Sequence, residues 1–381
     1  MQDLDDAAGL LAALVEIESI NPSLVPSGTG ERKIAEFTGG WMRRQGMEVA
    51  TQEPRPNRPN VLGTVPGTGG GGRSLLLVAH LDTVDVSGMR DPFRPSIERG
   101  RMFGRGAYDM KAGLTAAMLA GAAVAGDRLR GDVIIAAVCD EEYESLGVQA
   151  LVETHRADGA VVTEPTEMQV AVAHKGFDWF EVEVEGRAAH GSRPHLGVDA
   201  IVKMGGVLRE LDRLNARLRN SRRHPLLGGG NVHASLIRGG QELSSIPGSC
   251  TLALERRTVP GEGPDHTSSE LRELLELVSM ADPEFMAMHR LLLHREPFEI
   301  DPGHELVSLL RASASQISGR EPATVAVSFW ADSAFLGAAG IPTVLFGPRG
   351  AGAHETVEWV ELRDVGTCAQ TLALLARRFC S

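Results

Sequence analysis

The chain has 381 residues, of which 43% are hydrophobic and 23% are charged. This composition is typical of a folded protein of two or three domains and excludes a disordered chain. The 38 basic and 50 acidic residues give a net charge of −12. That charge argues against a nucleic-acid-binding surface and against electrostatic docking on anionic lipid.

The N-terminus and the cysteines indicate a cytoplasmic protein. Residues 1–17 are acidic and lack the basic region and cleavage pattern of a signal peptide. The longest largely apolar stretch, Ala112–Gly126, has 15 residues, which is too short to span a bilayer. The four cysteines are widely spaced and form no CxxC pair, which disfavours a disulfide framework or a cysteine zinc site. We therefore expect no membrane and no nucleic-acid partner.

Helical and strand patterns alternate in the first 175 residues and return after residue 297. The strands are continuous apolar runs, as is typical of buried parallel strands. The expected strands are 75–79, 133–138, 159–162 and 341–346, and the expected helices are 6–17, 31–45, 111–125, 304–315 and 365–379. This alternation predicts an α/β sheet with helices on both faces.

Residues 176–296 follow a different pattern. Phe177–Glu185 alternates apolar with acidic residues, which predicts a strand with one solvated face. The expected order is strand 177–185, helix 198–218, strands 231–237 and 250–256, helix 268–279 and strand 285–293. This order is ferredoxin-like. The sequence therefore predicts a discontinuous large domain, residues 1–175 and 297–381, interrupted by a small α+β domain of residues 176–296.

Histidine and carboxylate side chains follow three of the expected parallel strands. His80 and Asp82 follow the first, Asp140-Glu141-Glu142 the second and Glu164 the third. Active sites of parallel α/β sheets lie beyond the carboxyl ends of the strands. Each signal has a plain alternative: three adjacent carboxylates can form a solvated loop, and a lone histidine is more often structural than a ligand.

Two further residues complete this set. Asp109 lies just before the helix at 111–125, where an N-cap is the plain alternative, and His354 follows the apolar stretch 341–346. Two histidines and several carboxylates form the ligand set of two Zn²⁺ ions. Two metal ions suit hydrolysis because they acidify a water and polarise a carbonyl. A further carboxylate beside them can act as general base.

Six segments, taken in order, resemble the metallopeptidase family of aminoacylase, acetylornithine deacetylase, succinyl-diaminopimelate desuccinylase and the glutamate-releasing carboxypeptidases. They are LLLVAHLDTVDV, GRGAYDMKAG, CDEEYESLG, VVTEPTE, GRAAHGSRPHLGVDAI and AHETVEWVEL. The resemblance covers nearly the whole chain. It implies a zinc-peptidase-like three-layer α/β/α catalytic domain with an inserted ferredoxin-like lid/dimerisation domain.

The resemblance also implies two Zn²⁺ ions per subunit, with Co²⁺ or Mn²⁺ as alternatives. His80 and Glu164 would hold one ion. Glu142 and His354 would hold the other, and Asp109 would bridge the two.

Two further roles in the large domain come from the resemblance. Asp82 would be the acid that supports His80. Glu141 would be the general base, which takes a proton from the attacking water and later delivers it to the leaving amine.

Three residues of the inserted domain have family counterparts. His190 resembles the lid histidine that reaches into the partner subunit's site and helps to stabilise the oxyanion, which implies a homodimer. Arg257 matches the lid arginine that pairs with a substrate carboxylate, although a surface strand cap is the plain alternative. Ser244 stands where relatives commonly carry an asparagine that hydrogen-bonds the substrate, and its hydroxyl is shorter than an amide.

The resemblance implies hydrolysis of the amide bond of a small N-acyl amino acid. The alternative within enzymes is a dipeptidase or a glutamate-type carboxypeptidase with the same metal centre. A non-catalytic binding protein on the same fold is a second alternative, because fold does not fix function. Retention of both histidines and of all the proposed carboxylates disfavours the non-catalytic alternative.

Overall fold

The computed structural model describes residues 2–221 and 223–381. It divides into two compact units. Unit 1 comprises the described chain up to Val172 together with Ile300–Val325 and Ala331–Ser381. Unit 2 comprises Ala173–Glu299 and Ala326–Trp330. The middle of the chain therefore forms most of unit 2, and the chain returns to unit 1 after Glu299, apart from Ala326–Trp330.

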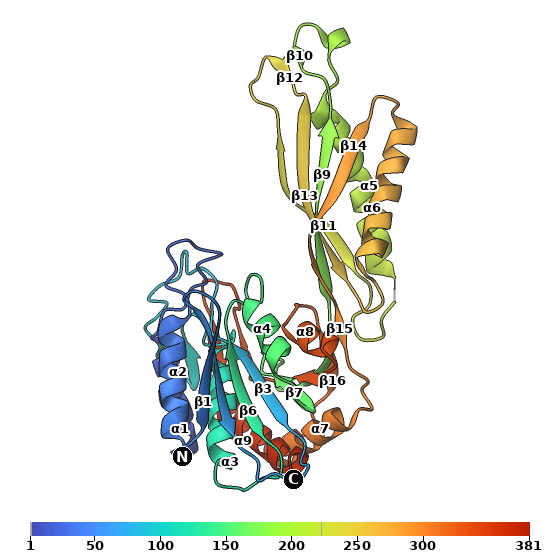
Figure 1. The fold of residues 1–381 in the computed structure, drawn as a ribbon. Helices are drawn as coiled ribbons and strands as arrows, with labels where there is room; N and C mark the ends of the chain where they lie inside the picture. The colour runs from blue at the N-terminus through green and yellow to red at the C-terminus, as the bar shows by residue number, and fades with distance from the viewer. Residues whose placement is uncertain (1, 222) are drawn as a thin grey trace. The chain divides into compact units, whose positions relative to one another are not determined.

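The central strands of unit 1 belong to a mixed nine-stranded sheet (Figure 1). Its order is β1-β2-β6-β3-β7-β17-β8-β15, with β16 paired to β8. Strands β6, β3, β7 and β17 run parallel to one another. The bounds are β1 Glu48–Arg55, β2 Arg58–Val65, β3 Leu75–His80, β6 Val133–Val138, β7 Gly159–Val162, β8 Val170–His174, β15 Phe298–Glu299, β16 Thr324–Val327 and β17 Thr343–Leu345. Every residue of β3, β6 and β7 is buried, which explains their continuous apolar sequences.

Helices cover both faces of this sheet, which confirms the predicted α/β class. Gly121 of α3 lies against Ile135 on one face, and on the opposite face Asn60 donates to the carbonyl of Gly147 in α4 at 2.8 Å. Helices α1, α2, α7 and α9 lie on the α3 side, and α8 packs beside α4 (Figure 1). The bounds are α1 Gln2–Val15, α2 Arg32–Arg44, α3 Lys111–Val124, α4 Leu146–Thr154, α7 Glu305–Ser318, α8 Ser333–Ala338 and α9 Leu362–Phe379.

A second, small sheet of unit 1 has the order β18-β19-β5-β4. Its strands are β4 Ser96–Glu98, β5 Arg101–Phe103, β18 Gly350–Ala351 and β19 Trp359–Glu361. The segments before α3 and after β17 are thus joined, which brings the regions of Asp109 and His354 to the same part of the unit.

Unit 2 has an antiparallel sheet in the order β11-β13-β9-β14, the ferredoxin-like arrangement. The strands are β9 Gly176–Glu185, β11 Asn231–Gly239, β13 Ser249–Thr258 and β14 Met286–Arg295, and the helices are α5 Ala200–Asn220 and α6 Pro264–Ala281. Alternate residues of β9 and β13 are buried, and Phe180 and Leu252 pack with α5 and α6 in one core. A short ladder joins β10 (Ala189–His190) to β12 (Ser245–Ile246), beside a 3₁₀ turn, η1, at Pro194–Leu196.

The sequence did not predict every element. The β1–β2 hairpin was missed because most residues of β1 are exposed and polar, so no apolar run marks it. This hairpin and strand β8 also make the sheet mixed rather than parallel. Helix α6 begins four residues earlier than expected, with Pro264 in its first turn, a position that proline favours.

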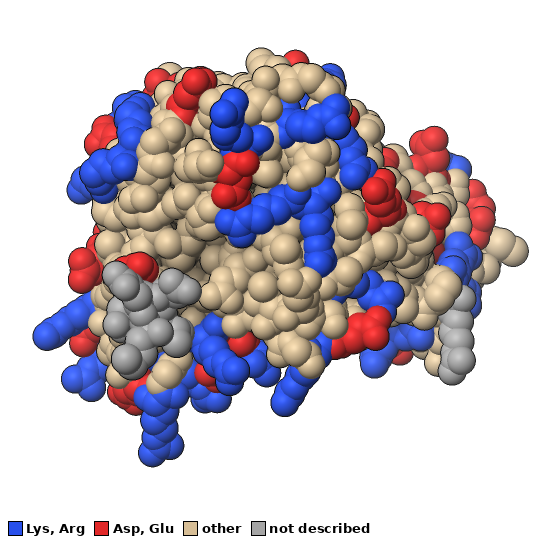
Figure 2. All heavy atoms as spheres, turned by 90° about the horizontal axis from the view of Figure 1, so that it is seen from below, with Lys and Arg blue, Asp and Glu red and all other residues tan. Residues whose placement is uncertain are grey.

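The surface and the helices add two observations. The face shown in Figure 2 carries both basic and acidic side chains, so the net negative charge does not appear there as one acidic field. Among the described helices, none combines the length and apolar character needed to cross a membrane.

Gly113 of α3 lies against the segment after β7. A Cβ at Gly113 would lie 2.0 Å from the carbonyl oxygen of Thr163. We predict that Gly113→Ala lowers the thermal unfolding midpoint by an amount equivalent to about 1–3 kcal/mol or more, because backbone must move to admit the methyl group. Differential scanning calorimetry would measure the midpoint.

Gly9 is the matched control for this substitution. It lies in α1 and is exposed, and apart from its chain neighbours and the backbone of its own helix, a Cβ added there would have no described atom within 4 Å. Gly9→Ala should therefore leave the midpoint unchanged or raise it, by up to about 1 kcal/mol in stability. A Gly113→Ala protein that is as stable as the parent would show that the contact with Thr163 relaxes without cost.

Candidate metal centre

Asp109 lies between the two histidines that the sequence singled out. His80 is the last residue of β3, and its Nε2 lies 3.2 Å from Oδ1 of Asp109. His354 lies in the turn before β19, and its Nε2 lies 3.4 Å from Oδ2 of Asp109. One carboxylate therefore presents a different oxygen to each imidazole, which is the arrangement that a bridging ligand needs.

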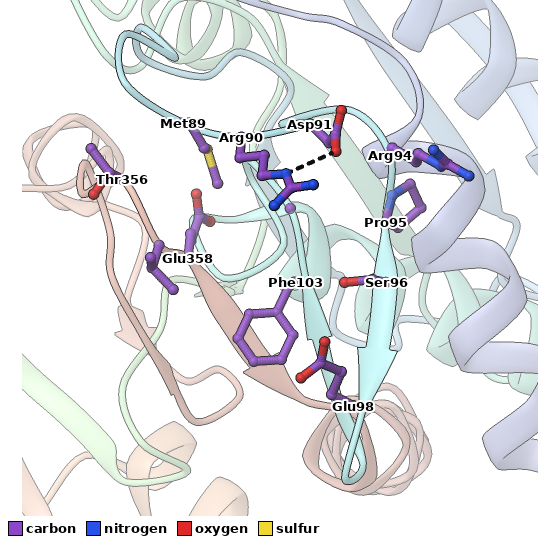
Figure 3. A pocket seen from close by; sticks show the side chains of 12 residues that line it. Met89, Arg90, Asp91, Arg94, Pro95, Ser96, Glu98, Phe103, Thr356 and Glu358 are labelled. Atoms are coloured by element: carbon purple, nitrogen blue, oxygen red, sulfur yellow. Dashed lines mark ion pairs between the residues drawn. The ribbon is translucent and has the colours of Figure 1, made fainter.

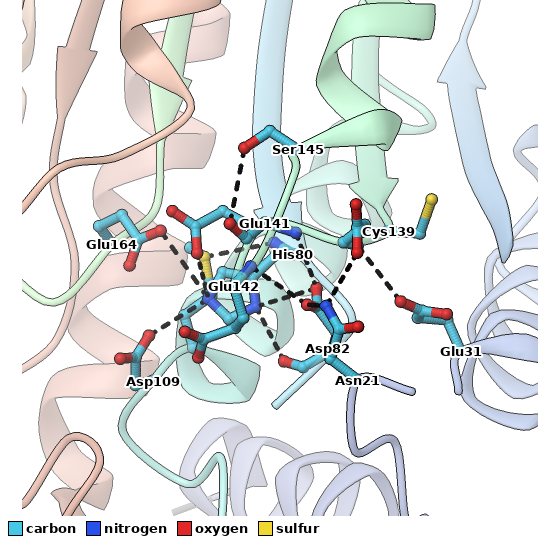
Figure 4. A network of polar contacts seen from close by, with 12 residues as sticks. Asn21, Glu31, His80, Asp82, Asp109, Cys139, Glu141, Glu142, Ser145 and Glu164 are labelled. Atoms are coloured by element: carbon cyan, nitrogen blue, oxygen red, sulfur yellow. Dashed lines mark hydrogen bonds and ion pairs between the residues drawn. The ribbon is translucent and has the colours of Figure 1, made fainter. Parts of the chain in front are cut away.

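Three glutamates, Glu141, Glu142 and Glu164, lie around His80 (Figure 4). Glu142 Oε2 lies 3.1 Å from His354 Nε2. Glu164 Oε1 and Glu141 Oε2 lie 3.9 Å and 4.0 Å from His80 Nε2. All five predicted ligands and the predicted base are thus brought to one site by the ends of β3, β6 and β7 and by two loops.

Ligand atoms gather in two overlapping groups among the described residues. One consists of His80, Asp109 and Glu142, and the other of His80, Glu141 and Glu164. Each residue contributes one ligand atom, and the three ligand atoms of a group lie within 4.8 Å of one another. His354 belongs to neither group, although it contacts both Asp109 and Glu142. The grouping also places Glu141 as close to His80 as Glu164 is, so distance alone does not separate base from ligand.

Burial and like charge dominate the electrostatics of the site. Burial raises the pKa of Glu141 well above its usual range, and the charges of Glu164, Asp332 and Glu142 raise it further, against the opposing charge of His80. Burial also raises the pKa of Glu164 and of Glu142. Several carboxylates thus resist ionisation together, which is expected where nearby charges have the same sign.

For the two imidazoles and Asp109, by contrast, the pKa shifts favour the charged form. Burial alone would lower the pKa of His80, but the hydrogen bond with Asp109 and the charges of Glu164 and Glu141 raise it well above its usual range. Hydrogen bonds with Asp109 and Glu142 raise the pKa of His354 to about 10. Hydrogen bonds from His354 and His80 outweigh burial and lower the pKa of Asp109. The surrounding carboxylates therefore favour positive charge on His80 and His354, on either side of the ionised Asp109.

The residues present fit divalent metal ions. The set of two imidazoles and several carboxylates is suited to zinc, with carboxylate oxygen and imidazole nitrogen as ligands. Glu142 Oε1 is buried and has no hydrogen-bond partner among the described residues. A buried carboxylate oxygen without a donor is costly, and a cation would satisfy it.

Asp82 lies beside His80 but contacts it in an unexpected way. His80 Nδ1 lies 2.9 Å from the backbone carbonyl of Asp82 and 3.7 Å from its carboxylate. The carboxylate instead accepts hydrogen bonds from the backbone amides of Glu141 at 3.1 Å and Glu142 at 3.2 Å. Asp82 therefore orients the imidazole through its carbonyl and holds the neighbouring loop through its side chain.

The loop that carries Asp109 wraps around Glu358. This buried carboxylate accepts hydrogen bonds from the backbone amides of Gly106, Tyr108 and Asp109 at 2.8–3.0 Å. Arg105 donates to the same carboxylate at 2.8 Å. Glu358 thus fixes the backbone at Asp109.

Sequence reasoning missed Glu358 and Asp332 as parts of the site. Asp332 is 1% exposed, and its charge raises the pKa of Glu141 and of Glu164. Neither residue follows directly after one of the parallel strands, where the sequence analysis expected the site residues. Glu358 follows His354 by four residues, so its proximity was the one available signal.

A pocket of about 610 Å³ lies beside this loop, between residues 89–96 and residues 356–358 (Figure 3). Arg90, Arg94 and Phe103 line it together with Glu358. None of the five predicted metal ligands does. The pocket therefore adjoins Glu358, which fixes the Asp109 loop, and not the metal-ligand cluster itself.

Two of the three predicted residues of unit 2 lie together. His190 pairs with Ser245 in the ladder of β10 and β12, and the Gly191 amide donates to the Ser244 carbonyl at 2.7 Å. Both His190 and Ser244 are exposed. The Ser244 hydroxyl donates to Glu242 at 2.8 Å.

Arg257 lies elsewhere, near the end of β13, where it pairs with Phe177 in the register. Its Nε donates to Glu255 at 2.6 Å, and its guanidinium lies 5.0 Å from the centre of the Phe177 ring. Its charge is thus already matched within unit 2.

Comparisons with known proteins identify the relatives of this chain. The family model of peptidase family M20/M25/M40 matches residues 76–378. Acetylornithine deacetylase from Myxococcus xanthus is 31% identical over 330 residues, which cover 84% of each chain. Acetylornithine deacetylase from Salmonella arizonae is 28% identical over 381 residues, which cover 97% of this chain and 96% of that one.

Solved structures share the fold at low sequence identity. The aminopeptidase PepT from Bacillus cereus has a TM-score of 0.81 and 18% identity, with 99% of both chains covered. The YXEP protein from Bacillus subtilis, described as a dinuclear metal-binding peptidase, has a TM-score of 0.75 and 14% identity, with 100% of this chain and 99% of that chain covered. Since the family model spans more than half of the sequence, the chain belongs to peptidase family M20/M25/M40 and is a metal-dependent hydrolase of amide bonds.

Proposed function

We propose that the protein hydrolyses the amide bond of a small N-acyl amino acid, as an acetylornithine-deacetylase-like enzyme, with unit 1 as its catalytic domain. The observation that carries this proposal is the carboxylate of Asp109, which presents one oxygen to His80 and the other to His354. The similarity to two acetylornithine deacetylases favours an N-acyl amino acid as the substrate.

The proposed centre holds two Zn²⁺ ions per subunit. His80 and Glu164 would hold one, Glu142 and His354 the other, and Asp109 would bridge them. When bound, two such ions supply Lewis acidity that activates a water and polarises the scissile carbonyl. The buried Glu142 Oε1, which has no donor in the described part of the chain, supports a cation at this place.

Glu141 is the proposed general base. It follows β6 directly beside the ligand Glu142, and its side chain is 10% exposed. Burial and neighbouring carboxylates raise its pKa, which makes the carboxylate a stronger proton acceptor. Glu141 accepts a proton from the attacking water and delivers it to the nitrogen of the leaving amine.

Glu141→Gln should lower kcat by about 10²–10⁴-fold, because the amide cannot accept the proton. The substitution should leave two metal ions per chain, since Glu141 is not among the proposed ligands. Turnover assays and metal analysis of the purified protein would measure both effects. Glu142→Gln is the control and should lose metal. Near-normal turnover of Glu141→Gln would refute the assignment.

The substrate class is tested by amine release from a panel of amides with Zn²⁺ or Co²⁺ supplied. The panel contains N-acetyl and N-succinyl derivatives of amino acids with basic, acidic and apolar side chains, together with dipeptides. We predict that the N-acyl amino acids are hydrolysed with the higher kcat/KM. Preference for dipeptides would assign the protein to the peptidase alternative and leave the metal centre unchanged.

Unit 2 is the proposed lid/dimerisation domain. His190 and Ser244, which lie side by side, would complete the site, with His190 stabilising the oxyanion in the partner subunit. An exposed histidine with its ring nitrogen held by Ser192 at 2.8 Å is available for such a role. Arg257 would bind a substrate carboxylate, for which it must exchange its contact with Glu255.

An apolar surface in unit 2 supports a homodimer. Strand β11 is at the edge of its sheet, and its residues Leu236 and Ile237 are 60% and 52% exposed. Val202, in the first turn of α5, is 69% exposed, and Ile201 lies against Gly239 of β11. An exposed sheet edge with adjacent apolar side chains is suited to pairing with a second copy.

The dimer proposal predicts complementation between two inactive variants. In a heterodimer of Glu141→Ala and His190→Ala, one site has both its own base and the partner's histidine. Random mixing should therefore restore about a quarter of the parental activity. Activity would be assayed after subunit exchange, with sedimentation used to verify that both variants are dimers. If dimeric mixtures regain nothing, the histidine does not act across the interface.

We also propose a cytoplasmic location. The four cysteines are free thiols, and all four are buried, a state suited to a reducing compartment.

A further inference from the structure

A second layer of polar side chains lies buried behind Glu141 and Glu142. Asn21, Glu31, Asp82 and Asp140 are 0% exposed and Arg58 is 7% exposed. They come from the segment after α1, from the start of α2, from β2 and from the ends of β3 and β6. A buried set of this kind is stable only when its members satisfy one another. Figure 4 shows the part of it that adjoins the metal-ligand cluster.

Arg58 is the cation of this layer. Its Nε and Nη2 donate to the two oxygens of Glu31, each at 2.7 Å. Nη2 also donates to Asp140 at 2.6 Å. Two of the three carboxylates thus share one guanidinium, and Asp82 needs other donors.

Asn21 provides those donors. Its Nδ2 donates to Asp82 at 2.8 Å and to Asp140 at 2.9 Å. Its Oδ1 accepts from Arg58 at 3.2 Å and from the amide of Ser23 at 2.9 Å. Both donors and both lone pairs of the amide are used. The backbone of Asn21 is also fixed, because its amide donates to the carbonyl of Thr83 at 2.9 Å.

These side chains hold the backbone on both sides of the proposed base. Asp82 accepts from the amides of Glu141 and Glu142. Asp140 has a positive φ of 67°, a conformation that is unfavourable for a residue with a side chain. Its amide donates to Glu31 at 3.2 Å, and its carboxylate accepts from the amide of Glu144 at 3.2 Å. Several hydrogen bonds therefore fix the backbone turn at Asp140. From this turn, the side chain of Glu141 extends to His80 and that of Glu142 to His354.

We propose that Asn21 and Arg58 are positioning residues: through Asp82 and Asp140 they set the backbone from which Glu141 and Glu142 extend to the reacting centre. This inference rests on the proposed function. Neither residue touches the metal-ligand cluster directly, so each acts through a carboxylate. A displacement of about 1 Å at a catalytic group can cost 10²-fold in rate, and partners of metal ligands commonly contribute 10–100-fold to metal affinity or activity.

Asn21→Ala tests the proposal without changing the number of buried charges. We expect kcat to fall about 10–100-fold while KM changes little. We also expect weaker binding of Co²⁺ to the metal-free protein, measured by titration, and a changed visible absorption spectrum of the Co²⁺-loaded protein. Titration and spectrum report the placement of Glu142 independently of turnover.

Asn60→Ala is the matched control. Asn60 is also a fully buried asparagine of unit 1, and it binds the backbone of Cys139 and Gly147, which lie outside residues 140–142. It should lower the unfolding midpoint as Asn21→Ala does, with Co²⁺ affinity and kcat close to those of the parent. If both variants lose kcat and Co²⁺ affinity equally at a temperature where both are folded, general loosening explains the loss and the proposal is wrong.

Arg58 gives a second test. Arg58→Lys keeps the positive charge and should retain more activity and Co²⁺ affinity than Arg58→Met, which leaves Glu31 and Asp140 without their cation. If Arg58→Met does not fold, the measurements on Asn21→Ala still test the positioning role. Normal kcat and Co²⁺ binding in Asn21→Ala, together with an inactive Glu141→Gln, would overturn this inference and leave the proposed function intact. Normal turnover in Glu141→Gln would instead overturn the proposed function.

Discussion

Repulsion among buried carboxylates is the constraint on which the structure of unit 1 depends. Asp109, Glu141, Glu142 and Glu164 have side chains that are at most 16% exposed, and all lie around His80 and His354. Ionised carboxylates at such separations cost a great deal in a protein interior unless positive charge compensates them. The two imidazoles compensate in part, which explains their raised pKa values. Divalent ions would complete the compensation.

Two different devices hold the carboxylates in place against this repulsion. The loop at Asp109 is organised around a single acceptor, Glu358, whose two oxygens bind three backbone amides and Arg105. The loop at Glu141 is organised by a shared network in which Asp82 and Asp140 accept from backbone and side-chain donors. Both devices use carboxylates that are not themselves ligand candidates. The site therefore contains three carboxylates, Glu358, Asp82 and Asp140, beyond the proposed metal ligands and general base.

The parts of the fold that the sequence could predict are those with a local signature. Strands β3, β6 and β7 are buried on both faces, so each appears as an unbroken apolar run, and the residue after each run could be read directly. Asp109 and His354 were singled out by their places before an expected helix and after an apolar stretch, and the resemblance to a known family then supplied their separate roles. Asn21 and Arg58 could not be found in either way. They are single polar residues in ordinary surroundings, and only the tertiary structure shows that they are buried against Asp140.

The order of strands has a consequence for the synthesis of the chain. Strand β17 lies between β7 and β8 in the sheet, although more than 160 residues separate it from both in the sequence. All of unit 2, including Ala326–Trp330, is made before this gap in the sheet can be filled. His354, nine residues beyond β17, arrives later still. All the acidic ligand candidates precede His354 in the sequence, so they are synthesised before the second imidazole is available. The metal centre can therefore be completed only after His354 has been synthesised. A chain interrupted before His354 would contain the acidic ligand candidates but lack the second imidazole.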